Sequence, residues 1–530
     1  MATVLNSVVL DRAGLDRLLR PRMDVVTEQV GDGGDPGTDP ETGTVTAHFE
    51  AAVGPLRTYE RAVEARPRPD GRFDVTERSH FELAIPLWGI LFVPGYRHEL
   101  RRIDRRDSPR HPWWAPPDRV DARAARILGL LCTVSLVVGY LGTVVTQTIT
   151  YATDGFGASD SAQGNLLAAV RVGVLLALVI VSMADRRGRR RLVLGATIAS
   201  CATTALGALA PNMVVLGATQ VVSRGLSMAV VMLITVIAAE EMPAGSRAYA
   251  VSVMTMTGAL GAGMCLWALP LTGLGDNGWR LLYVIPLLGI PVTLWVARYL
   301  PESRRFARPH RDVAVLRGHG RRMALLGVSF FLISAFGAPA TQLMNDFLKD
   351  ERGFSASRIA LFTMLTTTPG GIGLVAGGRM ADVRGKRLIV AVGVAGGAAL
   401  TLASFMSYGW PMWVWNLFGT ILAAAAGPAL GMYGPELFPT SARGRANGII
   451  QTVSVAGSAL GLVFAGRMLD SGGLASAMRP LLIGPLVVAV LVLLFFPETA
   501  RRELEELNPE DQGVGLPVSP DPATSPPPRR

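Results

Sequence analysis

Long apolar runs without charged side chains dominate the middle of this chain. Residues 127–151 hold no charge at all, and about 20 such residues are enough to cross a membrane as a helix. Short polar breaks divide the middle of the chain into twelve runs, at 125–149, 162–184, 189–210, 212–239, 248–271, 279–300, 322–346, 357–381, 387–408, 410–434, 444–468 and 475–496. The pattern predicts an all-α membrane protein with twelve transmembrane helices.

The two ends of the chain have a different composition. Residues 1–120 and 497–530 are polar and rich in Arg and Pro. Within the first of these regions, Phe73–Leu83 alternates apolar and polar side chains, as a strand does. The apolar run Leu83–Val93 that follows is too short to cross a membrane. We interpret 1–120 as a small N-terminal cytoplasmic α+β region, with a surface-bound position of Leu83–Val93 as the alternative, and we expect 497–530 to be mostly disordered.

Charge indicates topology rather than chemistry. The net charge is +10, yet only 17% of the residues are charged, and the arginines gather in alternate breaks, at 186–191, 301–322, 384–387 and 443–445. Basic residues collect in the cytoplasmic loops of membrane proteins. We therefore expect a multi-pass protein of the cell (plasma) membrane with both termini in the cytoplasm, and no nucleic-acid partner. The three cysteines lie in apolar runs without metal-ligand spacing, so we expect no metal.

One sequence motif occurs twice in the chain. Met-Ala-Asp-x-Arg-Gly-[Arg/Lys]-Arg surrounds both Asp185 and Asp382, 197 positions apart. Other features recur at offsets of 195 or 196: Thr146-Gln147 with Thr341-Gln342, Glu240 and Arg247 with Glu436 and Arg443, and Glu302 with Glu498. The chain is therefore expected to contain two six-helix pseudo-symmetric halves, 125–300 and 322–496, joined by a cytoplasmic linker at 301–321. One large class of secondary transporters has this architecture.

The repeated motif carries a family resemblance. Asp185–Arg190 resembles the Asp-Arg-x-Gly-Arg-Arg signature of the major facilitator superfamily, and Asp382–Arg387 keeps its Asp, its Gly and its basic pair. Pro301-Glu302-Ser303, Pro435–Thr440 and Pro497-Glu498-Thr499 resemble the sugar-porter and metabolite–proton symporter branches. The resemblance covers about Ala125–Leu507. Two positions depart from the pattern, because Val383 replaces an Arg and Val181 replaces a Gly.

The resemblance implies a belt of charge that latches the two halves together at their cytoplasmic ends. Gly188 and Gly385 are expected to supply an unusual backbone angle in the short loops. The two loop aspartates can pair with arginines or with the N-terminus of a neighbouring helix. The predicted cytoplasmic gate consists of Asp185, Arg186, Gly188, Arg189, Glu240, Arg247, Glu302, Asp382, Arg384, Gly385, Arg387, Glu436, Arg443 and Glu498. The alternative is that some of these charged residues serve only to fix the membrane topology.

Polar side chains at membrane depth are candidates for the transport site. Amides both donate and accept hydrogen bonds, and the Gln147/Gln342 pair recurs in both halves; contact between helices is the alternative role for such groups. The candidates for substrate binding are Thr146, Gln147, Arg171, Thr341, Gln342, Asn345, Asn416 and Gln451.

Two buried arginines need partners. Arg171 and Arg224 cannot lose their protons, so each requires an acid, a carbonyl cluster or an anionic substrate. Arg224 resembles the helix-four arginine that the family uses in proton coupling. Residues 128–153 hold no Asp or Glu, which leaves Asp346 as the leading candidate for a proton site.

We therefore expect a secondary active transporter, proton-coupled and functional as a monomer in the lipid bilayer, that moves a small polar metabolite such as a sugar or an organic acid. A proton-driven drug exporter of the same fold and a non-transporting membrane sensor are the alternatives. The sequence has no P-loop, no HExxH and no nucleophile elbow, so neither an enzyme nor a cofactor is expected.

Overall fold

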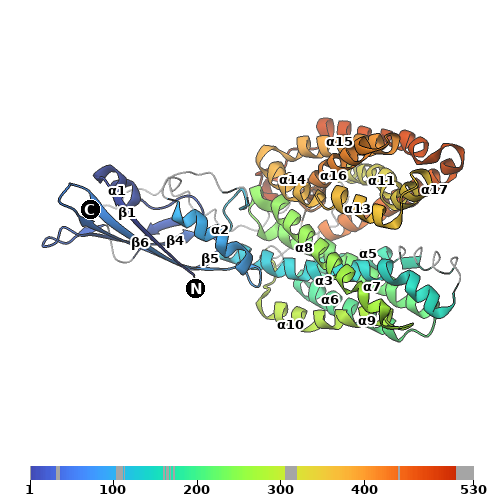
Figure 1. Ribbon diagram of the computed structural model, residues 1–530, viewed down its shortest axis with the longest axis horizontal. Coiled ribbons are helices and arrows are strands. Elements are labelled where there is room, and N and C mark those ends of the chain that lie inside the picture. Colours follow the sequence, from blue (N-terminus) through green and yellow to red (C-terminus); the bar gives the residue numbers. More distant parts are fainter. Residues whose placement is uncertain are drawn as a thin grey trace.

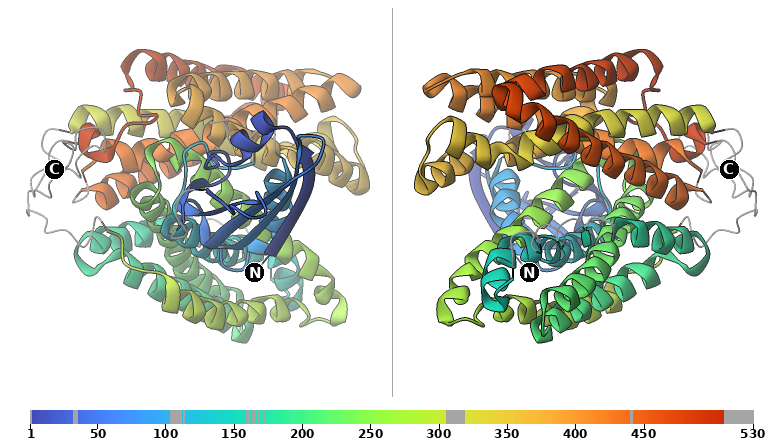
Figure 2. Two further views of the ribbon diagram at one scale, coloured as in Figure 1. Left: turned by 90° about the vertical axis from the view of Figure 1, so that its left-hand side faces the viewer. Right: turned by 90° about the vertical axis from the view of Figure 1, so that its right-hand side faces the viewer.

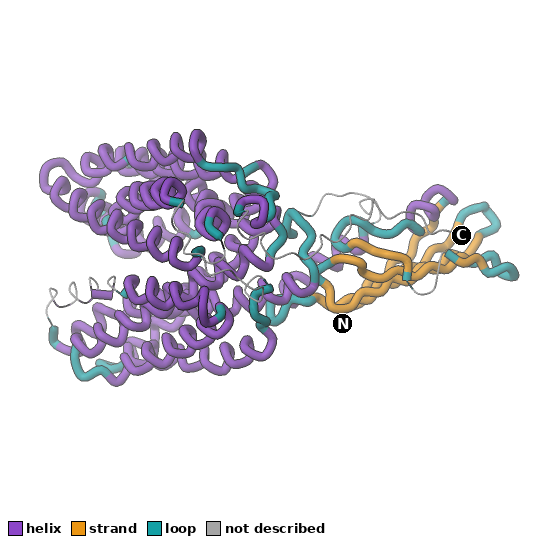
Figure 3. Tube along the Cα trace, turned by 180° about the vertical axis from the view of Figure 1, so that it is seen from behind, coloured by secondary structure: helices purple, strands orange, loops and turns teal. Residues whose placement is uncertain are grey.

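The computed structural model describes residues 2–31, 36–102, 112, 114–158, 162, 166, 169–170, 173–304, 319–439 and 442–508 (Figure 1). The side chains of 174, 185, 186, 356, 357, 360, 469–472 and 505 are also outside the description. All the strands lie at one end of the molecule, and the long helices fill the rest of it (Figure 3). Viewed from that end, the sheet stands in front of two groups of helices (Figure 2).

The N-terminal sheet is antiparallel throughout, in the order β1-β6-β5-β4-β2, with β3 paired to β4. Its strands are β1 (Ala2–Leu10), β2 (Thr27–Val30), β3 (Gly37–Thr38), β4 (Val45–Val53), β5 (Leu56–Pro67) and β6 (Phe73–Leu83). The strand predicted at Phe73–Leu83 is confirmed, because alternate residues of β6 are buried. Two helices accompany the sheet, α1 (Arg12–Leu18) and α2 (Gly89–Arg101).

The sheet region has a charged cluster inside it. Arg61 contacts Glu28 at 2.6 Å, and the hydroxyl of Tyr59 donates to the same carboxylate at 2.6 Å. Arg22 pairs with Asp24 at 2.6 Å and donates to the carbonyl of Glu99 in α2 at 2.7 Å. Burial lowers the pKa of the Arg22 guanidinium, but Asp24, with smaller contributions from Tyr59 and Glu77, raises it by more, so this pKa lies above its ordinary value. These contacts keep the buried charges paired and hold α2 against the sheet.

The helices form two successive groups along the chain (Figure 1). The first group comprises α3 (Ala122–Phe156), α5 (Val174–Arg187), α6 (Arg189–Leu206), α7 (Met213–Glu241), α8 (Arg247–Ala268), α9 (Trp279–Val284) and α10 (Gly289–Tyr299). The second group comprises α11 (Gly320–Gln342), α12 (Met344–Asp346), α13 (Ala356–Thr367), α14 (Gly370–Arg384), α15 (Lys386–Met406), α16 (Trp410–Leu437), α17 (Arg443–Leu481) and α18 (Ile483–Phe495). A last short helix, α19 (Leu504–Leu507), follows.

Ten helical segments in the described part of the chain are long and apolar enough to cross a membrane. The second predicted span, 162–184, is described in part: residues 163–165, 167–168 and 171–172 lie outside the description, and its described helix is α5, whose apolar part Leu175–Ala184 is shorter than the ten candidate spans. The eighth, 357–381, is interrupted at Thr368–Pro369 and forms α13 and α14. Proline lacks a backbone N–H and crowds the preceding turn, which breaks a helix. The count of twelve spans stays a prediction.

Small residues let the helices approach closely. A Cβ added at Gly139 of α3 would lie 1.9 Å from the carbonyl oxygen of Gly258 in α8. In the second group, one added at Gly373 of α14 would lie 2.0 Å from the carbonyl oxygen of Ile421 in α16. Membrane helices associate through such contacts because lipid offers no hydrophobic driving force between them. Each group is therefore a tightly packed unit.

Candidate functional site

The candidate site lies where the two helix groups meet next to the sheet, an end that we call the sheet-side end. Two short loops enter it, and each contains a glycine with positive φ: +91° at Gly188 and +105° at Gly385. Side chains disfavour such angles, whereas glycine adopts them freely. The predicted unusual backbone angle is confirmed at both positions. It lets α6 and α15 begin immediately after the helices that precede them.

A glutamate caps the helix that follows each glycine. Glu302 Oε1 accepts hydrogen bonds from the backbone N–H groups of Arg189 and Arg190, at 3.2 and 3.1 Å. Glu498 accepts from the N–H of Lys386 at 2.9 Å in the same way. A carboxylate stabilises a helix N-terminus because it satisfies unpaired donors and complements the helix dipole. The two caps are 196 positions apart, like the motifs that contain them.

Glu240 joins the two helix groups from the first group. Its carboxylate contacts Arg189 of its own group and Arg443 of the second group. The hydroxyl of Ser303 donates to the same carboxylate at 2.6 Å. Glu240 is 7% exposed, and the two arginines are exposed by no more than 1%. Charges this deeply buried are stable only when they are paired.

Glu436 makes the corresponding contacts from the second group. It contacts Lys386 of its own group, and Arg247 of the first group lies 3.8 Å away. Arg247 also lies 3.3 Å from Glu503 and donates to the carbonyl of Arg502 at 2.9 Å. Each group thus presents one glutamate to an arginine of the other group. The following six side chains are called the charge network: Arg189, Glu240, Arg247, Lys386, Glu436 and Arg443.

Asp382 connects the groups in a different way. Its carboxylate accepts hydrogen bonds from the backbone N–H groups of Tyr249 at 2.9 Å and Ala248 at 3.3 Å, in the first turn of α8. This is the contact with a neighbouring helix N-terminus that the sequence suggested. The side chains of Asp185 and Arg186 lie outside the described residues.

Three residues of the site, Lys386, Ser303 and Asn508, were not part of the predicted gate. Lys386, not Arg387, contacts Glu436, while Arg387 gives its backbone N–H to Glu498 and Arg384 is exposed. The 197-residue offset does align Lys386 with Arg189, so the repeat contained this signal. No sequence pattern indicated that Ser303 or the start of the tail belongs to the site. The side-chain amide of Asn508 donates to the carbonyl of Glu436 at 2.8 Å, so the first part of the region 497–530 packs on the site; 509–530 lie outside the described residues.

A cavity of about 500 Å³ with mostly apolar walls and several neutral polar side chains lies within the second group, between α11, α12, α13, α15, α16 and α18. Its polar lining consists of Thr341, Asn345, Thr363, Thr367, Thr401, Asn416 and Thr420. The amide of Asn416 donates to the hydroxyl of Thr366 at 2.7 Å. Within the described part of the chain, no charged side chain lines this cavity. It therefore offers neutral donors and acceptors beside apolar walls.

The structure brings together three of the eight substrate-binding candidates, Thr341, Asn345 and Asn416. The other described candidates are not part of the cavity lining: Thr146 and Gln342 are exposed, whereas Gln147 and Gln451 are half-buried. Arg171 lies outside the described residues.

The two proton-coupling candidates lie on different helix groups. Arg224 of α7 donates to the carbonyl of Gly142 in α3 at 3.0 Å, so a carbonyl is among its partners, one of the options that the sequence left open. Asp346 is exposed at the end of α12.

Comparison of the sequence with known proteins identifies the family to which the chain belongs. The family model of the Major Facilitator Superfamily matches residues 130–433 and 325–524. The "Multidrug resistance protein B homolog" of Mycobacterium tuberculosis (strain CDC 1551 / Oshkosh) is 27% identical over 252 residues, 45% of this chain and 43% of that protein. The "Cis,cis-muconate transport protein" of Acinetobacter baylyi is 24% identical over 250 residues, 44% of this chain and 59% of that protein. The chain thus spans less than two thirds of the length of either relative.

A solved structure supports the fold. The proton:xylose symporter XylE superposes with a TM-score of 0.60 at 18% identity, over 72% of this chain and 97% of that chain. At this identity, the likeness concerns the fold alone.

Proposed function

Because this chain belongs to the major facilitator superfamily, we propose that it moves a small polar solute across the membrane by alternating access, with the charge network as the latch of one gate. The observation that carries the proposal is the reciprocal pairing of Glu240 with Arg443 and of Glu436 with Arg247. Two such contacts across one interface close together or open together. A non-transporting sensor has no need of this reciprocity.

The free-energy cost of opening the latch depends on whether the separated charges reach water. Removal of one partner from a buried ion pair costs about 3–5 kcal/mol, because the other charge stays behind without compensation. When both partners separate into water, hydration replaces the pair and the cost falls. Opening of the sheet-side end to water is therefore the movement that this network permits. In this proposal the paired network closes the sheet-side end, and solute enters from the opposite end.

Membrane orientation follows from the same residues. The loops at the sheet-side end contain the Arg-rich breaks, including 186–191 and 384–387. Under the positive-inside rule this end faces the cytoplasm, together with the sheet region 1–120, the linker 301–321 and the tail 497–530. The membrane halves would then be 125–300 and 322–496. The working unit in this proposal is a monomer in the plasma membrane.

The cavity of the second group supports a neutral, hydroxyl-rich solute of the sugar class. Ligand pockets commonly enclose about 300–1,000 Å³ with a few placed polar groups, and this one has threonine hydroxyls and two amides. Organic acids remain candidates through Arg171 and Arg224, outside the cavity lining. Proton coupling is assigned to Arg224 and Asp346 as a hypothesis, together with the roles of Thr146, Gln147, Gln342 and Gln451 in binding.

A drug exporter is the second candidate. The similarity to a protein named for multidrug resistance favours it, as do the apolar cavity residues Phe336, Phe362 and Val394. Lipophilic cations moved against a proton gradient would distinguish this function from sugar uptake.

The test is uptake into proteoliposomes that contain the purified full chain. Radiolabelled hexoses, pentoses, dicarboxylates and a lipophilic cation are offered with and without an imposed pH gradient. Sugar uptake that needs the gradient and is lost in Arg224→Gln supports the proposal. Transport of the lipophilic cation alone replaces it with the exporter, and no flux of any solute in a folded protein replaces it with the sensor.

A further inference from the structure

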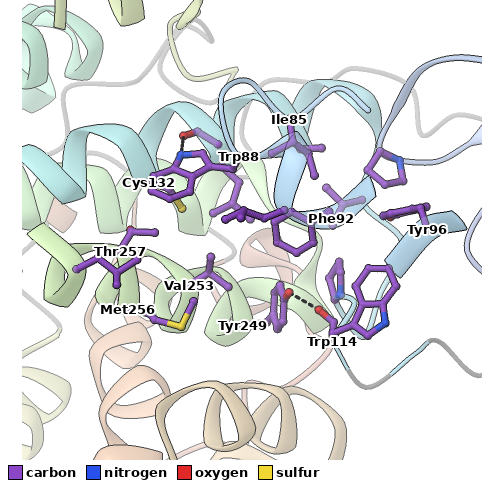
Figure 4. A pocket seen from close by; sticks show the side chains of 18 residues that line it. Ile85, Trp88, Phe92, Tyr96, Trp114, Cys132, Tyr249, Val253, Met256 and Thr257 are labelled. Carbon is purple, nitrogen blue, oxygen red and sulfur yellow. Dashed lines mark hydrogen bonds between the residues drawn. The ribbon is translucent and has the colours of Figure 1, made fainter. Parts of the chain in front are cut away.

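An apolar groove separates the sheet region from the first helix group (Figure 4). Its volume is about 130 Å³, and none of the described residues that line it is charged. We call it the junction groove; its main walls are Trp88 and Phe92 of the α2 segment, Trp114, Cys132 of α3, and Tyr249 and Val253 of α8. Figure 4 shows Phe92 and Val253 on opposite sides of it.

The polar groups of Trp88 and Tyr249 in the walls of the junction groove already have partners. The indole N–H of Trp88 donates to the carbonyl of Gly129 and to the hydroxyl of Thr133, both at 3.1 Å. The hydroxyl of Tyr249 donates to the carbonyl of Trp114 at 2.6 Å. These bonds hold the aromatic rings in place but leave only apolar surface facing the groove. An occupant must therefore be recognised by shape and hydrophobic contact.

The groove lies on helices that span the membrane. Its lining includes Ala125 to Cys132 in the first turns of α3 and Tyr249 to Leu260 in α8, and both helices are candidate spans. At about 1.5 Å per residue, the α8 part extends roughly 15 Å, which is about one leaflet of a hydrocarbon core of about 30 Å. Leu260 is 47% exposed. The groove is therefore open at Leu260, within the candidate membrane span of α8.

Three large apolar side chains project beside the groove at the start of α2. Leu87, Ile90 and Leu91 are 62%, 78% and 67% exposed. Trp88, between them, bonds to α3 within its membrane-spanning part, so this tip lies at the level where the span begins. Aromatic and aliphatic side chains at that level anchor interfacial segments in a leaflet.

We propose that the acyl chain of a phospholipid from the sheet-side leaflet occupies the junction groove, with Leu87, Ile90 and Leu91 inserted in that leaflet. A dry apolar cavity of about 150 Å³ holds one benzene-sized ligand, so the groove accepts a segment of one chain and leaves the headgroup outside. The lipid then becomes part of the contact that fixes the sheet region on the helices. This inference does not depend on the transported solute.

The test uses the full chain in phospholipid nanodiscs that contain a trace of phosphatidylcholine with a diazirine in the middle of one acyl chain. After irradiation, labelled peptides are identified by mass spectrometry. We expect enrichment in the peptides that contain residues 85–92 and 253–260 over those from other lipid-facing helices. Val253→Trp fills the groove and is expected to lower this labelling about tenfold, the change in occupancy when roughly two methylenes lose their contacts.

Val222→Trp is the matched control, because Val222 of α7 is 40% exposed and does not line the groove; its labelling should equal wild type. Leu91→Glu changes an exposed rim position, so it tests the proposal even if Val253→Trp fails to fold, and it should also lower labelling. Labelling spread evenly over lipid-facing helices overturns the proposal. Labelling by a free diazirine fatty acid but not by the phospholipid also overturns it.

Discussion

The carboxylate of Glu240 contacts the guanidinium of Arg443, although the two residues belong to different helix groups and are 203 positions apart. Both side chains are buried, and Arg189 shares the carboxylate. The pair therefore links the two helix groups, and in the proposed function it holds the sheet-side end closed. Its counterpart, Glu436 with Arg247, is longer, at 3.8 Å between Oε1 and the guanidinium nitrogen. Mutation of the shorter pair, Glu240 with Arg443, is therefore the stronger test of the proposed gate.

Arg443→Gln should open the sheet-side end. Loss of one partner of a buried pair costs up to about 3–5 kcal/mol in the closed state, and we expect a value at or below the lower end because Arg189 still contacts Glu240. A reporter cysteine is introduced as Ser252→Cys, at a fully buried position whose side chain packs against Gly378 of the other group. We expect its reaction with a membrane-permeable maleimide to accelerate by at least about tenfold, since each 1.4 kcal/mol of population shift is a factor of ten.

Two features make this measurement specific. The native cysteines Cys132, Cys201 and Cys265 are buried and are replaced by Ala beforehand. The control is Asp16→Asn, which removes one partner of an exposed ion pair with Arg12 and should leave the rate unchanged. Equal rates in Arg443→Gln and in its parent would show that this contact does not hold the gate closed.

Glu498→Ala should destabilise the protein by about 1 kcal/mol, the usual loss for a helix cap. Glu498→Gln retains an acceptor oxygen for the N–H of Lys386 and should lose less. Thermal unfolding in detergent, followed by tryptophan fluorescence, measures both. Glu64→Gln, in an exposed pair with Arg66, is the control with no expected change. Identical melting of the alanine variant and wild type would mean that the cap contributes nothing.

Gly385→Ala should be more harmful than an ordinary glycine substitution. The φ of +105° costs a side chain about 1–3 kcal/mol, and the new Cβ would lie 2.8 Å from Glu498 Oε2. Gly195→Ala in α6 is the matched control, because nothing lies within 4 Å of its added Cβ. Alanine there should stabilise the helix by up to about 1 kcal/mol. Equal unfolding temperatures for the two variants would contradict this reasoning.

Asn416→Leu should weaken transport of the polar solute. The amide would leave the cavity, and a lost hydrogen bond of about 1–3 kcal/mol predicts a fall of about tenfold in kcat/KM for uptake. Thr366→Val removes only the partner that the amide contacts at 2.7 Å and separates an indirect effect from a direct one. Thr235→Val, whose hydroxyl bonds within its own helix, should transport like wild type. Unchanged uptake in Asn416→Leu would exclude this cavity as the substrate site.

Local patterns in the sequence determined the parts of this protein that depend on neighbouring residues. Apolar runs predicted long helices, and alternation predicted the strand Phe73–Leu83. The repeated loops predicted glycine-dependent backbone at Gly188 and Gly385. These features follow from periodicity and backbone preference, which act over a few residues. Even the break at Pro369 had a local cause, although the apolar pattern concealed it.

Only the tertiary structure decided which distant groups meet. It brought Lys386, which the repeat aligns with Arg189, into contact with Glu436. Of the two kinds of partner that the sequence left open for Asp382, it selected the first turn of α8. It gathered Asn345 and Asn416 around one cavity without Gln342, and it formed the junction groove between two parts of the chain that no motif connects. Such contacts depend on the rotation and depth of whole helices against one another. Packing over the entire molecule determines both, and no local pattern encodes them.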